Sequence, residues 1–203
     1  MDGKWYVQIV ILILVLFGFV APGRAGEPTQ QIQQTTDKIL SILSDPAFKD
    51  ASRSAERKML IGKTVDERFD WEEMARRSLA RHWTSRTPDE KKEFVQLFRN
   101  LLERTYMDKV EDYSGESVRY EGESVDANYA AVKVTILTSK NKEIPVEYRV
   151  AKKGPDWLVY DISIEGVSLV NNYRTQFNSI LAKSPYQELL KRLKDKVSSP
   201  QKE

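Results

Sequence analysis

Few side chains in this sequence are of types that could carry out chemistry. Asp161 directly follows the apolar segment Trp157–Tyr160, which has the pattern of a buried strand. A carboxyl group in such a place can act as a general base, as it does in small isomerases and hydratases. A more common role is a hydrogen-bonded carboxylate that orients the next helix. The sequence favours this second role, because no second acid or base accompanies Asp161, and catalysis by Asp161 stays the alternative hypothesis.

Ser168 and His82 are the remaining candidates for chemistry. Ser168 lies in the segment Gly166–Leu169, which lacks the second glycine of a nucleophile elbow, so we expect it to cap a helix. His82 is the only histidine, and the sequence contains no cysteine. One imidazole without thiolates does not make a metal cluster, and no glycine-rich phosphate loop is present. We therefore expect no metal, no cofactor and no enzymatic activity.

The N-terminus has the pattern of a secretory signal peptide. Lys4 precedes an apolar stretch, and small residues stand at Gly23 and Ala25, so we expect residues 1–25 to be removed. The alternative is a retained signal anchor, because the apolar residues 5–21 reach only the short limit for spanning a bilayer. Without Asp2, Lys4 and Arg24 the net charge is +1, which excludes a strongly basic nucleic-acid binder. An exported domain without cysteine suggests a bacterial periplasm.

The first half of the remaining chain has helical periodicity. We expect a first helix over residues 26–45 and a second that ends at Gly62. The second helix would bury one face, formed by Phe48, Ala51, Ala55, Met59 and Leu60. Asp70 is placed to cap a third helix. Thr87, Pro88 and Glu90 form a stronger start signal for a fourth helix over residues 88–108, whose buried stripe is wide and aromatic.

After this helix the apolar period changes from 3.6 to 2. Alternating residues begin at Val118, Val132 and Val146, and a fourth apolar run extends from Trp157 to Ile164. Short links at Gly122, Asn141 and Gly154 predict an antiparallel meander of four strands. Two helices follow, and a charged tail covers residues 197–203. Residues 26–196 therefore form one α+β domain, with N-terminal helices, a four-stranded antiparallel sheet and C-terminal helices packed across one sheet face.

Alternation and helical spacing also predict which side chains point inward from the helices and the sheet. We expect an inward-facing set formed by Phe94, Phe98, Leu101, Val134, Ile136, Val146, Tyr148, Tyr173 and Phe177. Such a set can fill a core or line an apolar cleft. From the pattern alone, a well-packed core is the favoured interpretation.

Two groups of residues resemble a known family. The segments in the first half are Phe69–Ala75, Trp83 and Thr87-Pro88, followed by Phe94 and Phe98. The segments in the second half are Trp157–Asp161, Glu165–Val170, Asn172–Arg174 and Gln176-Phe177. Over residues 30–195 the chain resembles the MlaC-type, or toluene-tolerance, periplasmic phospholipid-binding proteins. Ala80 departs from the glycine expected before Arg81, which puts only local helix packing in doubt.

The resemblance implies a fold like the cone of nuclear transport factors, with an apolar cleft. It also implies a monomeric periplasmic carrier that exchanges phospholipid with two partners: an outer-membrane lipoprotein complex, and an inner-membrane ABC transporter that has a lipid-binding periplasmic subunit. Such a carrier maintains the lipid asymmetry of the outer membrane. The nine inward-facing residues would then contact the acyl chains, with Arg149 and Arg174 at the rim.

Two questions remain open in the sequence. Arg76, Arg77, Arg81 and Arg86 form a basic helix face that is either simply solvated or used for docking to a partner. A purely structural periplasmic adaptor with a filled core would fit the same apolar pattern. We expect a lipid carrier, and the isomerase using Asp161 remains the alternative.

Overall fold

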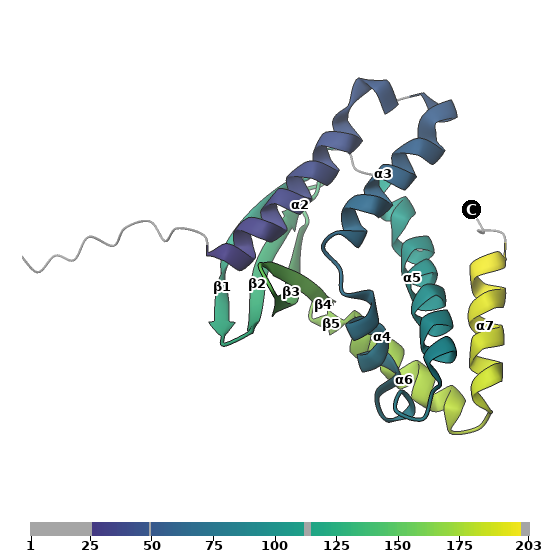
Figure 1. The fold of residues 1–203 in the computed structure, drawn as a ribbon. Helices are drawn as coiled ribbons and strands as arrows, with labels where there is room; N and C mark the ends of the chain where they lie inside the picture. The colour runs from purple at the N-terminus through teal and green to yellow at the C-terminus, as the bar shows by residue number, and fades with distance from the viewer. Residues whose placement is uncertain (1–25, 49, 112–114, 200–203) are drawn as a thin grey trace, which may run out of the picture.

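The computed structural model describes residues 26–48, 50–111 and 115–199 of the chain (Figure 1). The expected signal peptide at residues 1–25 lies outside the described residues. Helices and one antiparallel sheet make up the fold, so the predicted α+β class is confirmed. No helix in the described ranges is long and apolar enough to cross a membrane.

The strands lie in the sheet in the order in which they occur in the chain, and each strand pairs antiparallel with the next. Its strands are β1 (Ser117–Asp126), β2 (Tyr129–Leu137), β3 (Glu143–Lys153), β4 (Asp156–Ile164) and β5 (Val167–Ser168). Period-2 alternation predicted β1 to β3, and the apolar run from Trp157 to Ile164 predicted β4; the two-residue β5 was not predicted. Gly122 does not form a turn as predicted: with φ of 128° it lies at a bulge inside β1. The first hairpin turns instead at Ala127 and Asn128.

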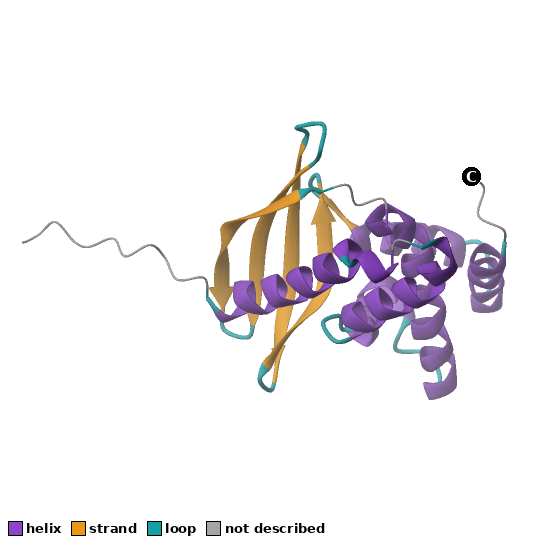
Figure 2. Ribbon diagram, turned by 90° about the horizontal axis from the view of Figure 1, so that it is seen from above, coloured by secondary structure: helices purple, strands orange, loops and turns teal. Residues whose placement is uncertain are grey.

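Helix α2 (Glu27–Ser44) crosses one face of the sheet (Figure 2). Ile32 packs there in an apolar cluster with Val132 of β2, Val150 of β3 and Val159 of β4. The carboxylate of Glu123 on β1 accepts a hydrogen bond of 2.8 Å from the backbone N–H of Thr29. Because the first turn of a helix leaves its N–H groups unpaired, this contact fixes the start of α2 on the sheet.

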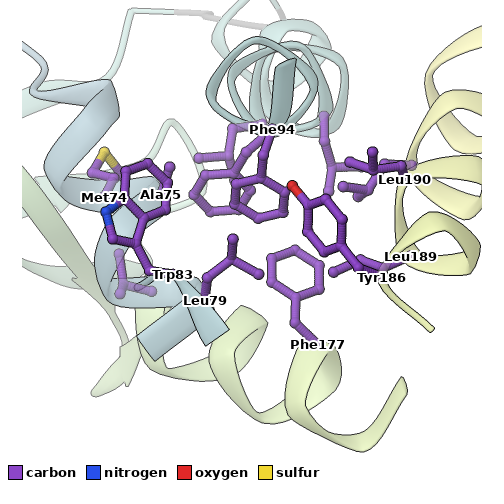
Figure 3. Close-up of a cluster of buried hydrophobic side chains, with 14 residues drawn as sticks. Met74, Ala75, Leu79, Trp83, Phe94, Phe177, Tyr186, Leu189 and Leu190 are labelled. Carbon is purple, nitrogen blue, oxygen red and sulfur yellow. The ribbon is translucent and has the colours of Figure 1, made fainter. Parts of the chain in front are cut away.

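The remaining helices form a bundle beside the sheet (Figure 1). They are α3 (Ser54–Asp66), α4 (Trp71–Leu79), α5 (Pro88–Glu111), α6 (Leu169–Leu181) and α7 (Tyr186–Ser198). Helices α4 to α7 bury a second apolar cluster (Figure 3). In this cluster Phe94 of α5 faces Phe177 of α6. Leu189 and Leu190 of α7 cover the cluster from the other side.

The predicted helix starts are confirmed by their hydrogen bonds. The Asp70 carboxylate accepts from the N–H of Glu73 at the start of α4. At the start of α5, Thr87 and Glu90 form a reciprocal pair: the N–H of Thr87 donates to the Glu90 carboxylate, and the N–H of Glu90 donates to the Thr87 hydroxyl. Two unpaired donors are thereby satisfied at the first turn of the longest helix.

The second predicted helix is wrong in its limits and in its buried face. Helix α3 starts only at Ser54 and continues past Gly62 to Asp66. Met59, expected on the inner face, is 64% exposed, whereas Ile61 is 1% exposed. A glycine ends a helix only where a left-handed residue is needed, and Gly62 instead lies buried within the helix.

The predicted start of the charged tail, at residue 197, lies too early in the sequence. Helix α7 includes Val197, which packs against the helical cluster, and Arg104 on α5 donates a hydrogen bond of 3.0 Å to the Val197 carbonyl. The folded domain therefore extends at least to residue 198.

Phe69 links the two apolar clusters, because it packs against both of them. The chain beside it pairs with β4: the N–H of Asp70 donates to the Val159 carbonyl at 2.8 Å, and the N–H of Val159 donates to the Arg68 carbonyl at 2.9 Å. This short parallel bridge holds the helical bundle against the edge of the sheet.

Candidate functional site

The sheet face that carries α2 continues as an apolar surface beyond the helix. Register places Val134 opposite Val146, and Ile136 opposite Ile144, so these side chains share the face with Val132. Val132, Val134 and Val146 are buried. Around them lie apolar side chains that keep accessible surface: Val118, Tyr120, Ile136, Ile144, Tyr148, Ile162 and Ile164. A continuous apolar face that is only half covered is the feature expected of a binding surface.

Two tyrosines stand within this apolar face. Tyr120 on β1 pairs with Val134, and Tyr148 on β3 pairs with Val132, so the two rings flank the same pair of valines on β2. Burial raises the pKa of Tyr148 to about 12. The same cause raises the pKa of Tyr120. Tyr148 nevertheless keeps some accessible surface, so it is partly open to solvent.

The nine residues predicted to face inward separate into two groups. Val134, Ile136, Val146 and Tyr148 lie together on the sheet face. The other five lie in the helical cluster: Phe94, Phe98, Leu101, Tyr173 and Phe177. The structure therefore does not bring all nine into one lining.

The aromatic side chains of the helical cluster pack on one another. Phe98 stacks on Phe94 at 5.9 Å between ring centroids and meets Phe177 edge-on at 5.8 Å. Phe94 and Phe98 have no accessible surface, and Phe177 is 3% exposed. Tyr173 keeps some accessible surface beside Phe98. The helical group thus forms core of the bundle, because each of its rings is already covered by another ring.

The two arginines expected at the rim differ in where the structure places them. Arg149 follows Tyr148 directly in β3, so alternation puts it on the opposite sheet face. There its guanidinium contacts Glu147 at 3.0 Å and Asp161 at 3.7 Å. The expectation that Arg149 lies at the rim of the apolar face is therefore wrong. Arg174 is exposed on α6 and donates a hydrogen bond to the Asn171 side chain.

Asp161, the candidate base, is held by the start of α6. Its Oδ2 accepts a hydrogen bond of 2.7 Å from the Ser168 hydroxyl, and its Oδ1 accepts one of 3.1 Å from the N–H of Val170. Ser168 also accepts from the N–H of Asn171, which confirms it as the helix cap. The carboxylate is 4% exposed and points away from the apolar face. This arrangement orients the start of α6, which is the structural role that the sequence favours for Asp161.

The other polar candidates form local contacts. The ring of His82 lies 3.3 Å from the side-chain oxygen of Asn178. Within the described ranges, no group of three or more metal-ligating side chains comes together.

The basic helix face is largely neutralised by neighbouring acids. Arg76 and Arg77 both pair with Glu73, at 2.5 and 2.6 Å, and the Arg77 guanidinium stacks 4.0 Å above the ring of Tyr160. Arg86 pairs with Glu90 at 3.4 Å. Arg81 donates instead to the neutral Asn178 side chain at 3.0 Å.

An open hollow of about 240 Å³ lies at the other end of the sheet. Its lining includes Val125, Tyr129, Arg149 and Tyr160. This hollow is small and mostly open to solvent, and it does not coincide with the half-covered apolar face. We place the candidate site on the half-covered apolar face, because apolar side chains from four neighbouring strands come together there.

Sequence reasoning missed several members of this face. Alternation places Val118 in a strand, but the predicted inward-facing set does not contain it. The set also lacks Tyr120, Ile144, Ile162 and Ile164. Register was the missing information: alternation shows which residues of one strand share a side, whereas pairing shows which sides of different strands coincide.

Comparison with known proteins agrees with this fold. The family model described as MlaC protein matches residues 33–195. The intermembrane phospholipid transport system binding protein MlaC of Haemophilus influenzae is 23% identical over 206 residues, which cover 97% of this chain and 94% of that protein.

A solved structure provides the comparison at the level of the fold. It is the phospholipid-binding protein from Ralstonia solanacearum in complex with a phospholipid, with a TM-score of 0.76 and 23% identity over 85% of this chain and 98% of that chain. The family model confirms the family resemblance of the sequence. Because the family model matches most of its length, the chain belongs to the MlaC family.

Proposed function

We propose that this protein binds phospholipid and carries it between membranes, with the acyl chains against the apolar face of the sheet. The observation that carries the proposal is the half-covered apolar face, found in a chain of the MlaC family. The relatives support it, since one is named a phospholipid transport binding protein and the other was solved with a phospholipid. Val134, Ile136, Val146 and Tyr148 are the proposed contacts, with Ile144, Ile162 and Ile164 beside them.

The energetics of a carrier explain why such a face is needed. Burying one methylene group stabilises by about 0.8 kcal/mol, so a chain of about 16 carbons gains on the order of 12 kcal/mol. A bilayer offers the lipid the same gain. A protein must therefore present an apolar area on the order of 1,000 Å² for two chains, and must shield it from water to stay soluble. Helix α2 covers one end of the face, and the helical bundle stands beside it (Figure 2).

The helical group takes a supporting role in this proposal. Phe94, Phe98, Leu101 and Phe177 hold the bundle together, so they fix the position of the partly buried Tyr173 without offering surface themselves.

We further propose the setting of this carrier. It is exported by the segment at residues 1–25 and acts in the periplasm as a monomer, without nucleic-acid partners. It exchanges lipid with an inner-membrane ABC transporter complex and with an outer-membrane lipoprotein complex. Arg81 is the proposed centre of the docking surface, because it is the arginine of the basic face that faces an amide and not a carboxylate. Replacing Arg77 and Arg81 together by Glu should weaken transporter binding, and unchanged binding would remove this surface from the proposal.

Native mass spectrometry of protein purified without detergent tests the lipid proposal. We expect a mass excess that matches one phospholipid and disappears on denaturation. Ile136→Glu places a charge on the apolar face and should abolish the excess. Lys133→Glu, on the same strand but on the opposite face, is the matched control and should retain lipid. A folded protein that carries no lipid and takes none from vesicles would instead indicate the structural adaptor with a filled core.

A further inference from the structure

The two tyrosines on the apolar face carry an inference that rests on the proposed function. On this face Tyr120 and Tyr148 are the two aromatic hydroxyls that flank Val132 and Val134. A phenylalanine at either position would bury the same ring without the polar oxygen. The hydroxyl groups therefore add nothing to apolar packing. What they add is the ability to form a hydrogen bond, and a bound molecule can supply the acceptor.

The hydroxyl of Tyr120 is buried and has no hydrogen-bond partner within the described part of the chain. Thr36 and Asp37 on α2 are its polar neighbours, and an interaction with the Thr36 side chain offsets part of the rise in the pKa of Tyr120. The Thr36 hydroxyl, however, donates its own proton to the Ile32 carbonyl at 2.9 Å. An unpaired buried hydroxyl destabilises the free protein, because water no longer satisfies it. This oxygen is therefore ready to donate to an acceptor that enters the site.

Tyr148 supplies a second hydroxyl on the same face, near enough to Tyr120 for the two groups to interact electrostatically. Its hydroxyl forms no hydrogen bond with any other residue that the structure describes. Burial raises its pKa to about 12, so the oxygen keeps its proton and acts as a donor at neutral pH. Burial of both hydroxyls favours a neutral acceptor over a charged phosphate, and the negative charge of Asp37 near Tyr120 acts in the same direction.

We propose that Tyr120 and Tyr148 donate hydrogen bonds to the acyl ester carbonyls of the bound lipid. A diacyl glycerophospholipid has two such carbonyls, and they lie where the polar end of the molecule joins its hydrocarbon chains. Contacts at this point set how deeply the chains enter. They also make the protein selective for ester-linked lipids over ether-linked lipids, which have the same chains and head group but no carbonyl oxygen.

A competition between matched lipids tests this proposal. Lipid-free protein is incubated with vesicles that contain equal amounts of dipalmitoyl phosphatidylglycerol and its dihexadecyl ether analogue, and native mass spectrometry gives the ratio bound. We expect the wild-type protein to enrich the ester lipid by roughly fivefold for each hydroxyl that donates, as a typical hydrogen bond would give. Tyr120→Phe and Tyr148→Phe should each lower this enrichment, and the double variant should bind both lipids equally.

Tyr129→Phe is the matched control, because Tyr129 is 50% exposed and lies outside the apolar face. Its enrichment should equal that of the wild-type protein. Equal binding of both lipids by the wild-type protein would overturn the inference and leave the proposed function standing. Full enrichment in the double variant would also overturn it. If neither lipid binds to the wild-type protein, the proposed function fails, and the inference fails with it.

Discussion

The carboxylate of Asp161, within β4, accepts a hydrogen bond of 2.7 Å from the hydroxyl of Ser168. Through this pair and the N–H of Val170, the start of α6 is fastened to β4. The contact fixes where the helical bundle stands relative to the sheet. Asp161 thus has a structural role, and its contribution to the free energy of unfolding can be measured separately from lipid binding.

Asp161→Ala should lower the free energy of unfolding by about 2–3 kcal/mol, because the N–H of Val170 and the Ser168 hydroxyl lose a charged acceptor. Urea denaturation measures the change. Asp156→Ala, which removes a carboxylate from the exposed start of the same strand, should change stability by less than about 0.5 kcal/mol. An Asp161→Ala protein of unaltered stability would contradict the structural role and revive the hypothesis of a general base.

Phe98→Ala should destabilise the protein by about 3–5 kcal/mol, since it leaves a cavity among Phe94, Tyr173 and Phe177. Met59→Ala, at a position that is 64% exposed, should have little effect. Where the Phe98 variant remains folded, it should still select ester-linked lipid. Loss of binding without loss of stability would place Phe98 in contact with the cargo.

Tyr120→Phe should leave the lipid-free protein as stable as the wild type, or more stable by up to about 1 kcal/mol. The reason is that the substitution removes an unpaired buried hydroxyl and keeps the ring. Thermal unfolding of lipid-free protein measures it. A loss above about 1 kcal/mol would show that the hydroxyl has a protein partner in the free state.

Glu73→Gln should make the stability of the protein less dependent on acid pH. Hydrogen bonds from Arg76, and also from Arg77, hold the pKa of Glu73 below its ordinary value of 4.5 against the opposite effect of partial burial. A carboxylate with a lowered pKa stabilises the fold above its ordinary pKa, and this contribution is lost as the pH falls through the folded value.

Urea midpoints at neutral and acid pH test the prediction for Glu73. The wild-type protein should exceed the variant by about 0.5–1 kcal/mol at neutral pH, and the difference should shrink below about pH 4.5. Glu72→Gln, at the exposed neighbouring position, controls for the loss of a charge in the first turn of α4. A difference that stays constant with pH would exclude this ion-pair network as its cause.

Local patterns predicted most of the elements. The cap at Asp70, the reciprocal pair of Thr87 and Glu90, and the Ser168 cap all form as expected, because each depends on residues three apart in the sequence. The strand pattern was equally clear. The buried face of α3 was wrong because its apolar periodicity is weak, so contacts with distant residues decided which side is buried.

The sequence by itself determined the α+β class, the strand order and the family, since these depend on short-range periodicity and on motifs that can be read along the chain. Only the tertiary structure decided that the inward-facing residues form two clusters. It also decided that Arg149 lies on the sheet face opposite the apolar face, and that Tyr120 and Tyr148 flank the same two valines. These relationships come from strand register and from the packing of helices that are distant in sequence. Contacts between segments that are distant in the sequence stabilise these arrangements. The pattern of residues within one segment does not show which other segment it will contact.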